Sequence, residues 1–262
     1  MKIQDFSQKK RNGVPISMVT CYDAWSAALI AETDIDCVLV GDSLAMVVYG
    51  HDTTIPADIE TMAAHTAAVK RGAPDAFIIG DMPFLSFRKD LDSAVDNAAS
   101  LIRAGANAVK LEGAAGNTGL IRHLVESGVP VMGHLGLTPQ SVHQLGGFKV
   151  QARSDEAADE LVEEAAALER AGCFALVLEA IPRDVATRVT SALAIPTIGI
   201  GAGPHVDGQV LVLQDLLGLT TAFKPKFVRT WMDGSTLIRD ALQGYHDDVV
   251  NGAFPNGGES YE

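Results

Sequence analysis

The sequence predicts an α/β protein with the (β/α)8 TIM-barrel fold, and two patterns carry this prediction. Short apolar runs bounded by turn residues recur eight times along the 262 residues, and nearly continuous apolar runs are typical of parallel strands buried on both faces. Amphipathic helical patterns separate the runs, which favours a closed barrel over a doubly wound sheet. Because no linker or low-complexity segment divides the chain, we expect a single barrel domain over residues 1–262, with a short turn-rich tail at 251–262.

The expected strands leave room for a helix between most neighbours. In chain order they are Met18–Cys21, Cys37–Val40, Phe77–Ile79, Ala108–Leu111, Val129–Met132, Ala175–Leu178, Thr197–Ile200 and Val210–Leu213.

An internal repeat shows how helices and strands alternate. The segment Arg103–Glu112 (RAGANAVKLE) recurs as Arg170–Glu179 (RAGCFALVLE). In each copy a helix ends at the glycine and an apolar strand follows, so both copies belong to αβ units.

The helices that precede the two copies have similar boundaries. Ser154 is expected to cap the second helix and Gly172 to end it, with an apolar stripe formed by Leu161, Ala165 and Leu168. The first helix is expected to begin at Asp90 or Asp92 and to end at Gly105, with a stripe formed by Val95, Ala98 and Ile102.

The composition favours small molecules as partners. A net charge of -13 opposes binding to nucleic acid or to an anionic membrane. The first ten residues, MKIQDFSQKK, lack the apolar core of a signal peptide, and no apolar run is long enough to cross a bilayer, so we expect a cytoplasmic protein. Cys21, Cys37 and Cys173 lack CxxC spacing and fall in apolar segments, which predicts buried, unbridged thiols.

Polar residues gather where the predicted strands end. Following the first six strands in order, they are Asp23, Asp42, Asp81, Glu112, His134 and Glu179. The carboxyl ends of parallel barrel strands meet at one mouth, where the chemistry of such barrels is found. We therefore expect a functional site there.

Three of these acids suggest a metal site. Asp42, Asp81 and Glu112 come from adjacent strands and would repel one another without a cation. Oxygen ligands without cysteine or a histidine pair suit Mg2+. The alternative is that Asp42 and Asp81 cap the helices that follow them.

Lys110 and Glu112 point to the same face of their strand, because strand side chains alternate. Charges that face a barrel interior are costly unless they are paired or used. Lys110 would hold a substrate carboxylate and stabilise developing negative charge.

Glu179 occupies the position of Glu112 in the repeat, but Val177 replaces the lysine two residues earlier. A carboxylate above an apolar residue is a better proton acceptor, so Glu179 is the predicted base. The alternative is a carboxylate hydrogen-bonded to a helix start. His134 is open between a satisfied core histidine and a pocket residue.

Seven motifs together resemble the ketopantoate hydroxymethyltransferase family over nearly the whole chain. They are TCYDA (20–24), VGDSLAMVVYGHDTT (40–54), HTAAVKRGAP (65–74), GDMPF (80–84), VKLEG (109–113), GHLGLTPQ (133–140) and IGIGAG (198–203). The resemblance implies a (β/α)8 barrel that binds Mg2+ and transfers a hydroxymethyl group from the co-substrate 5,10-methylenetetrahydrofolate to 3-methyl-2-oxobutanoate, through a Mg-stabilised enolate. The product would be 2-dehydropantoate (ketopantoate), in pantothenate and coenzyme A biosynthesis. A homo-oligomer, commonly a decamer, is also implied.

The resemblance also implies residue roles. Metal binding falls on Asp42, Asp81 and Glu112, contacts with the 2-oxo acid fall on Asp42, Ser43, Asp81 and Lys110, and proton acceptance falls on Glu179. His134 lies in a matched motif, which favours a position in the pocket and leaves its role open. The chain departs from some relatives at Gln214 and at residues 219–222, where those relatives have a glycine-rich segment and a histidine; this departure concerns the folate contacts.

Two other functions share this acidic mouth. One is a different Mg2+-dependent 2-oxo acid barrel enzyme, of the carbon–carbon lyase or phosphoenolpyruvate mutase type, which would not depend on folate. The other is a non-catalytic metabolite-binding barrel, which would bind metal and ligand without proton transfer.

Overall fold

The computed structural model describes residues 1–220 and 224–261, and these form two compact units, Met1–Val212 and Leu213–Glu262. The expected departure at residues 219–222 therefore lies partly outside the described residues. Over the described part of the chain, no helix combines the length and apolar character that crossing a membrane requires.

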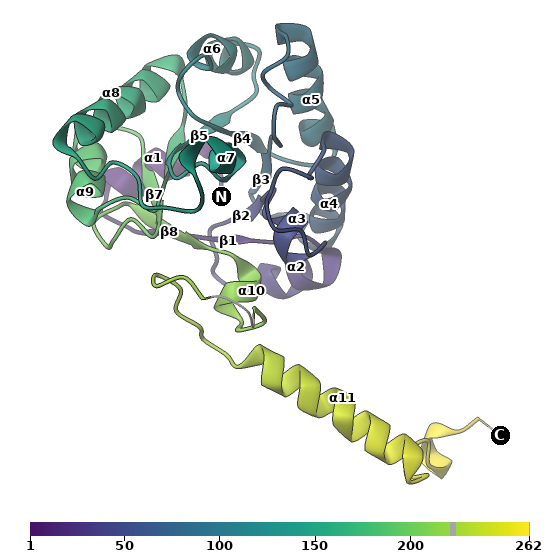
Figure 1. The fold of residues 1–262 in the computed structure, drawn as a ribbon. Helices are drawn as coiled ribbons and strands as arrows, with labels where there is room; N and C mark the ends of the chain where they lie inside the picture. The colour runs from purple at the N-terminus through teal and green to yellow at the C-terminus, as the bar shows by residue number, and fades with distance from the viewer. Residues whose placement is uncertain (221–223, 262) are drawn as a thin grey trace. The chain divides into compact units, whose positions relative to one another are not determined.

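The first unit is a closed barrel of eight parallel strands, each paired with its sequence neighbours, and β8 pairs with β1 (Figure 1). The predicted TIM-barrel fold is confirmed. The strands are β1 (Ile16–Thr20), β2 (Cys37–Val40), β3 (Ile78–Asp81), β4 (Ala108–Glu112), β5 (Val131–Gly136), β6 (Ala175–Glu179), β7 (Thr197–Ile200) and β8 (Gly208–Leu211).

Several strands extend further toward the mouth than the apolar runs predict. Asp81, Glu112 and Glu179 are the last residues of their strands, and His134 lies inside β5. The reason is that backbone pairing continues past the apolar run, with Glu112 opposite His134 in register. These side chains are therefore held by the sheet and not by loops.

The ends of other strands also differ from the prediction. β1 spans Ile16–Thr20 instead of Met18–Cys21, and β3 begins at Ile78, one residue later than expected. β5 begins after Pro130, which has no N–H to donate to a neighbouring strand. β8 begins two residues earlier than expected, because Gly208 pairs with Ile16 of β1, and Leu213 already starts a helix.

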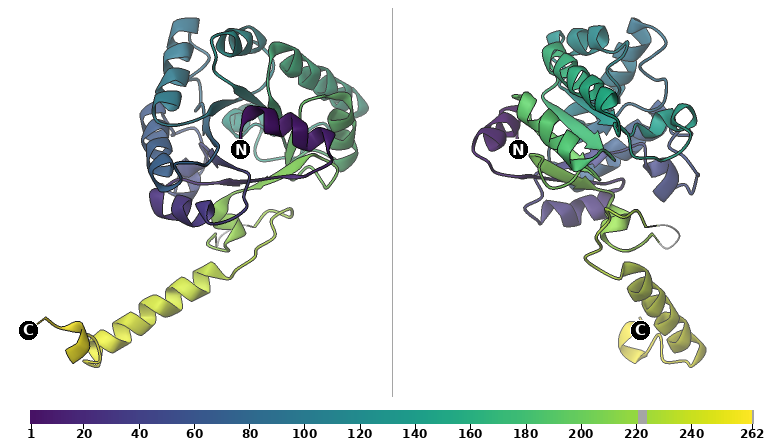
Figure 2. Two further views of the ribbon diagram at one scale, coloured as in Figure 1. Left: turned by 180° about the vertical axis from the view of Figure 1, so that it is seen from behind. Right: turned by 60° about the vertical axis from the view of Figure 1, so that its left-hand side comes forward.

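Helices surround the barrel, and Figure 2 shows α1 lying across one of its ends. In chain order the helices of this unit are α1 (Ile3–Arg11), α2 (Ala24–Ala31), α3 (Leu44–Val47), α4 (Ile59–Gly72), α5 (Leu91–Arg103), α6 (Thr118–Glu126), η1 (Pro139–Ser141), α7 (Val142–Leu145), α8 (Asp155–Ala171) and α9 (Arg183–Ala192). From α1, the fully buried Phe6 packs edge-on against Phe77 and Phe174. Because these two rings immediately precede β3 and β6, α1 closes the amino end of the barrel.

The repeat behaves as predicted, with one correction. α8 has Ser154 as its N-cap and the left-handed Gly172 at its end, and Leu161, Ala165 and Leu168 are buried. α5 is capped by Asp90, but its buried residues are Ala94, Ala98 and Leu101. Ala98 was predicted correctly, but Val95 and Ile102 are each one residue beyond the buried positions. The helix has apolar residues on two adjoining faces, and the face that carries the smaller alanines packs on the barrel.

The barrel interior changes from apolar to polar along the strands. In β4 the inward side chains are Ala108, Lys110 and Glu112, and only the first belongs to the apolar core, together with Met132 and Val177 of the next two strands. The three cysteines are buried and free, as predicted. Along β4, the inward-facing charges therefore lie in the carboxyl half of the strand.

The second unit contains α10 (Leu213–Leu216), α11 (Gly234–Val250) and η2 (Gly257–Glu259). Gln214 lies in α10, and Asp233 caps α11 by accepting from the amide of Thr236. Gly234 is the only residue of α11 that is buried. The large apolar side chains of α11 that are exposed are Leu237, Ile238, Leu242, Tyr245, Val249 and Val250.

Candidate functional site

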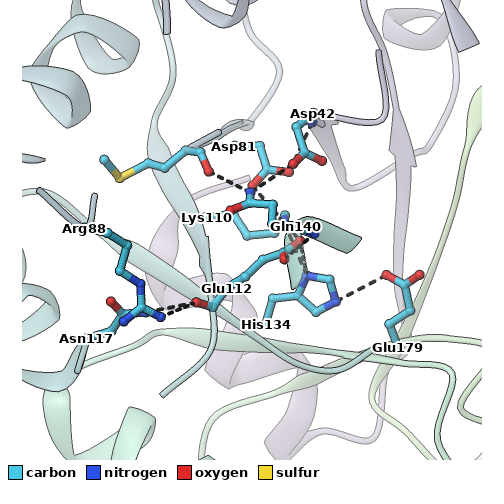
Figure 3. A network of polar contacts seen from close by, with 10 residues as sticks. Asp42, Asp81, Arg88, Lys110, Glu112, Asn117, His134, Gln140 and Glu179 are labelled. Carbon is cyan, nitrogen blue, oxygen red and sulfur yellow. Dashed lines mark hydrogen bonds and ion pairs between the residues drawn. The ribbon is translucent and has the colours of Figure 1, made fainter. Parts of the chain in front are cut away.

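A connected set of polar side chains fills the carboxyl mouth of the barrel (Figure 3). We call it the mouth cluster, and it consists of Asp42, Asp81, Lys110, Glu112, His134, Gln140 and Glu179. Six of its residues are at most 5% exposed, and the Glu179 side chain is 17% exposed. The structure thus brings together all the acids that the resemblance marks, with Lys110 and His134 among them.

Lys110 lies at the centre of the mouth cluster. Its Nζ is 2.7 Å from Asp81 Oδ1 and 3.9 Å from Glu112 Oε1. Burial lowers the pKa of Lys110, but the carboxylates of Asp81, Glu112 and Asp42 outweigh burial and raise that pKa above its usual value. Lys110 therefore stays an ammonium ion, as its place on the inward face of β4 predicts.

Amide groups hold one oxygen of each acid. The Asp42 N–H donates to Asp81 Oδ2 at 3.2 Å. Gln140 donates to two of the acids, from its backbone N–H to Glu112 Oε2 at 3.1 Å and from Nε2 to Asp42 Oδ2 at 2.9 Å. Each carboxylate plane is fixed in this way.

Asp42 and Asp81 do not cap the helices that follow them, so the helix-capping alternative is wrong. The N-caps of α3 and α5 are Ser43 and Asp90. Asp23, in contrast, caps α2 by accepting from the amide and hydroxyl of Ser26. Asp23 therefore has a structural role at the rim.

The positive charges of Lys110 and His134 do not fully compensate the four acids of the cluster, and the pKa values of Asp42 and Asp81 show this. Burial, together with Asp81 and Glu112, raises the pKa of Asp42 well above its usual value. Burial also raises the pKa of Asp81, although Lys110 opposes this effect. For Glu112, contacts with His134 and Lys110 outweigh burial and lower the pKa. A further cation near Asp42 and Asp81 would stabilise their ionised forms.

Two buried carboxylate oxygens of the cluster, Asp81 Oδ1 and Glu112 Oε1, accept from no amide. Both are in ion-pair contact with Lys110, and Glu112 Oε1 also contacts His134 Nδ1. Carboxylate oxygens that face positive charge form an all-oxygen set of the kind that a small hard cation prefers. In the ranges 1–220 and 224–261, no three His, Cys, Asp or Glu side chains are arranged to hold a metal ion by themselves. A Mg2+ ion does not require three such side chains, because it binds through one or two carboxylates and retains water ligands.

His134 bridges the two halves of the mouth. Its Nδ1 is 3.3 Å from Glu112 Oε1 and its Nε2 is 3.2 Å from Glu179 Oε2. Burial and Lys110 lower the pKa of His134, but the two carboxylates outweigh them and raise it to about 9. Glu179 thus has a cationic partner that the repeat did not predict. Val177 does lie beneath Glu179, but the partner comes from the neighbouring strand β5.

Ser43 and Gln140 complete the account of this region. The Ser43 hydroxyl is 2.8 Å from the hydroxyl of Tyr22, which is not part of the mouth cluster. Sequence reasoning missed Tyr22 and Gln140 as site residues. Both lie in matched motifs, TCYDA and GHLGLTPQ, but neither carries the charge by which the other candidates were found.

The profile of a family described as ketopantoate hydroxymethyltransferase matches residues 1–257. The chain belongs to the ketopantoate hydroxymethyltransferase family. Among similar curated proteins, the 3-methyl-2-oxobutanoate hydroxymethyltransferase of Bdellovibrio bacteriovorus is 58% identical over 99% of this chain and 98% of its own length. The Legionella pneumophila (strain Paris) protein of the same name is 53% identical over the full length of both chains.

Family membership makes the chain an enzyme, a hydroxymethyltransferase of pantothenate biosynthesis. The predicted resemblance is confirmed, and it selects the transferase over the lyase or mutase and the non-catalytic barrel.

Solved structures with the same fold have different chemistries. Phosphonopyruvate hydrolase in complex with oxalate and Mg2+ matches 99% of this chain and 93% of its own, with a TM-score of 0.64 and 13% identity. A 2,3-dimethylmalate lyase of the PEP mutase/isocitrate lyase superfamily matches 99% and 91%, with a TM-score of 0.60 and 15% identity. At these identities the likeness concerns the fold alone.

Proposed function

We propose that the chain transfers a hydroxymethyl group from 5,10-methylenetetrahydrofolate to 3-methyl-2-oxobutanoate, giving 2-dehydropantoate, with Mg2+ bound at the mouth cluster. The single observation that carries the site assignment is a buried set of three acids around Lys110, with Glu179 joined to the set through His134. The names of the relatives supply the acceptor substrate, and the donor follows from the family.

Asp42, Asp81 and Glu112 are the residues that would hold the metal, directly or through water. When bound, Mg2+ would polarise the carbonyl of the 2-oxo acid and make the neighbouring C–H bond more acidic. Ser43, Asp42, Asp81 and Lys110 would contact the substrate. The Lys110 ammonium stabilises negative charge on substrate oxygens in a water-poor site, where such an interaction is strong.

Glu179 is the proton acceptor in this proposal. It is the most exposed member of the mouth cluster, so a substrate can reach its carboxylate. The contact from His134 Nε2 fixes the orientation of the Glu179 side chain. Proton removal from C3 of the substrate creates the carbon nucleophile that the one-carbon unit requires.

The test separates proton transfer from folate chemistry. Proton NMR of 3-methyl-2-oxobutanoate in D2O, with enzyme and Mg2+ but no folate, should show loss of the C3 proton signal. Glu179→Gln should slow this exchange by about 10²- to 10⁴-fold, the usual contribution of a general base. Unchanged exchange in folded Glu179→Gln would remove the assignment of the base, and no exchange in folded, Mg2+-loaded wild type would refute the proposed enolisation.

We also propose that the protein is a homo-oligomer, as the family resemblance implies. Within Leu213–Glu262, helix α11 exposes large apolar side chains on successive turns. A second copy of the chain would bury them, which favours self-association.

A further inference from the structure

Gln140 connects loops and strands that carry three different parts of the mouth cluster. It lies in η1 after β5 and is 5% exposed. Its Nε2 donates to Asp42 Oδ2 at 2.9 Å and to the main-chain oxygen of Met82 at 3.0 Å. Its backbone N–H donates to Glu112 Oε2 at 3.1 Å. One residue therefore joins the β2, β3 and β4 ends of the barrel.

These contacts decide which oxygen of each acid stays available. Asp42 Oδ2, Asp81 Oδ2 and Glu112 Oε2 each accept from an amide, and Gln140 supplies two of those three donors. The opposite oxygens of Asp81 and Glu112 accept from no amide and are in ion-pair contact with Lys110. The amides thus leave these two oxygens facing one region, next to Lys110.

The side chain at position 140 needs two N–H donors and the length of glutamine. A primary amide nitrogen has two hydrogens, and here one serves Asp42 and the other serves Met82. A carboxylate would offer no donor and would face Asp42, and a shorter amide would not reach both acceptors. The backbone contact with Glu112, however, does not depend on the side chain.

We propose that Gln140 is a positioning residue that orients Asp42 for divalent-cation binding, through its side-chain amide. This inference rests on the proposed function, because it takes the mouth cluster as the metal site. Residues that orient metal ligands typically contribute about 10- to 100-fold to metal affinity.

The test uses Mn2+ as the probe, with binding followed by electron paramagnetic resonance and by calorimetry on the full chain. Gln140→Met keeps the side-chain length but removes both donors, and it should raise the Kd for Mn2+ by about 10- to 100-fold. The spectrum of the bound Mn2+ should also change, because the Asp42 carboxylate is free to rotate. Gln209→Met is the matched control, since the Gln209 amide donates to the main-chain oxygen of Gly203, which is not part of the mouth cluster.

Further variants and readouts make the outcomes decisive. Gln140→Asn, which keeps the amide but is one methylene shorter, should weaken Mn2+ binding as well and replaces Gln140→Met if that variant does not fold. A merely structural Gln140 would lower the melting temperature of the metal-free protein but leave the Kd and the Mn2+ spectrum as in wild type; that result overturns the inference. Absence of Mn2+ binding by folded wild type would instead overturn the metal site itself, and the inference with it.

Discussion

Lys110 shows how one residue serves both the stability and the chemistry of the barrel mouth. Its ammonium group compensates Asp81 and Glu112 inside the protein, where an unpaired charge is costly. The same group faces the position assigned to the substrate. Removal of this cation should therefore affect folding as well as catalysis.

The prediction is that Lys110→Met destabilises the protein by about 3–5 kcal/mol, because it leaves buried carboxylates uncompensated. Urea unfolding in the presence of EDTA measures this loss. Arg188→Met is the control, because it removes an ion pair with Asp159 in which both side chains are about half exposed or more, and such pairs contribute about 0–1 kcal/mol. Equal stability losses in the two variants would contradict the proposed role of Lys110.

For single residues, the sequence predicted which charged side chains lie in the site better than it predicted their contacts. Strand alternation was enough to place Lys110 and Glu112 on one face, because the period of a strand is fixed by covalent geometry. The His134 bridge could not be derived in this way, since it depends on the register between β4, β5 and β6. Gln140 was missed because an uncharged amide in a loop carries no pattern.

At the scale of elements, glycine sets the spacing between the ends of β5 and β6. Gly136 has a φ of 90°, and a Cβ placed there would lie 2.3 Å from the main-chain oxygen of Glu179. The same oxygen accepts a hydrogen bond from Leu137. Backbone contact at this point therefore positions the strand end that carries the proposed base.

Gly136→Ala should accordingly reduce both stability and activity. The positive φ alone costs about 1–2 kcal/mol for a residue with a Cβ, and relief of the contact must move the end of β6. We expect a lower melting temperature and at least about tenfold slower C3 proton exchange, a change in barrier of about 1.4 kcal/mol.

Gly119→Ala is the matched control for this substitution. Gly119 lies in α6, and no atom lies within 4 Å of a Cβ added there. Alanine is favoured over glycine in helices by about 0.5–1 kcal/mol, so this variant should be as stable as wild type or more stable. If Gly136→Ala exchanges the C3 proton at the wild-type rate, the end of β6 is not positioned by the contact between Gly136 and the main-chain oxygen of Glu179.

Helix boundaries were predicted where local chemistry decides them. Ser154, Asp90 and Gly172 mark the ends of their helices because capping and left-handed geometry involve only nearby residues. The face of α5 that packs inward was predicted one residue out of phase, because that choice depends on the fit to strands distant in sequence. Strand ends were extended for the same reason.

At the scale of the whole molecule, the closed barrel follows from the number and character of the apolar runs. The second unit was not predicted. The sequence was assigned to a single barrel domain with a turn-rich tail from Asn251, and helix α11, which precedes that tail and carries large exposed apolar side chains, was not identified. A single sequence shows an amphipathic helix, but it does not show what covers it. The net charge of -13 would oppose association unless an apolar surface outweighs it.

The final prediction concerns self-association through α11. Leu242 is 65% exposed and lies one turn from Ile238 and from Tyr245. If this face binds another copy, Leu242→Glu should place a charge in an apolar interface and shift the protein to smaller species, measured by sedimentation velocity. Gln243→Glu adds the same charge to the next residue, whose amide donates to Asp247 Oδ1, and should leave the distribution of species unchanged. Because the mouth cluster is built entirely from Met1–Val212, Leu242→Glu should retain Mn2+ binding; an unaltered assembly in this variant would exclude α11 as the contact surface.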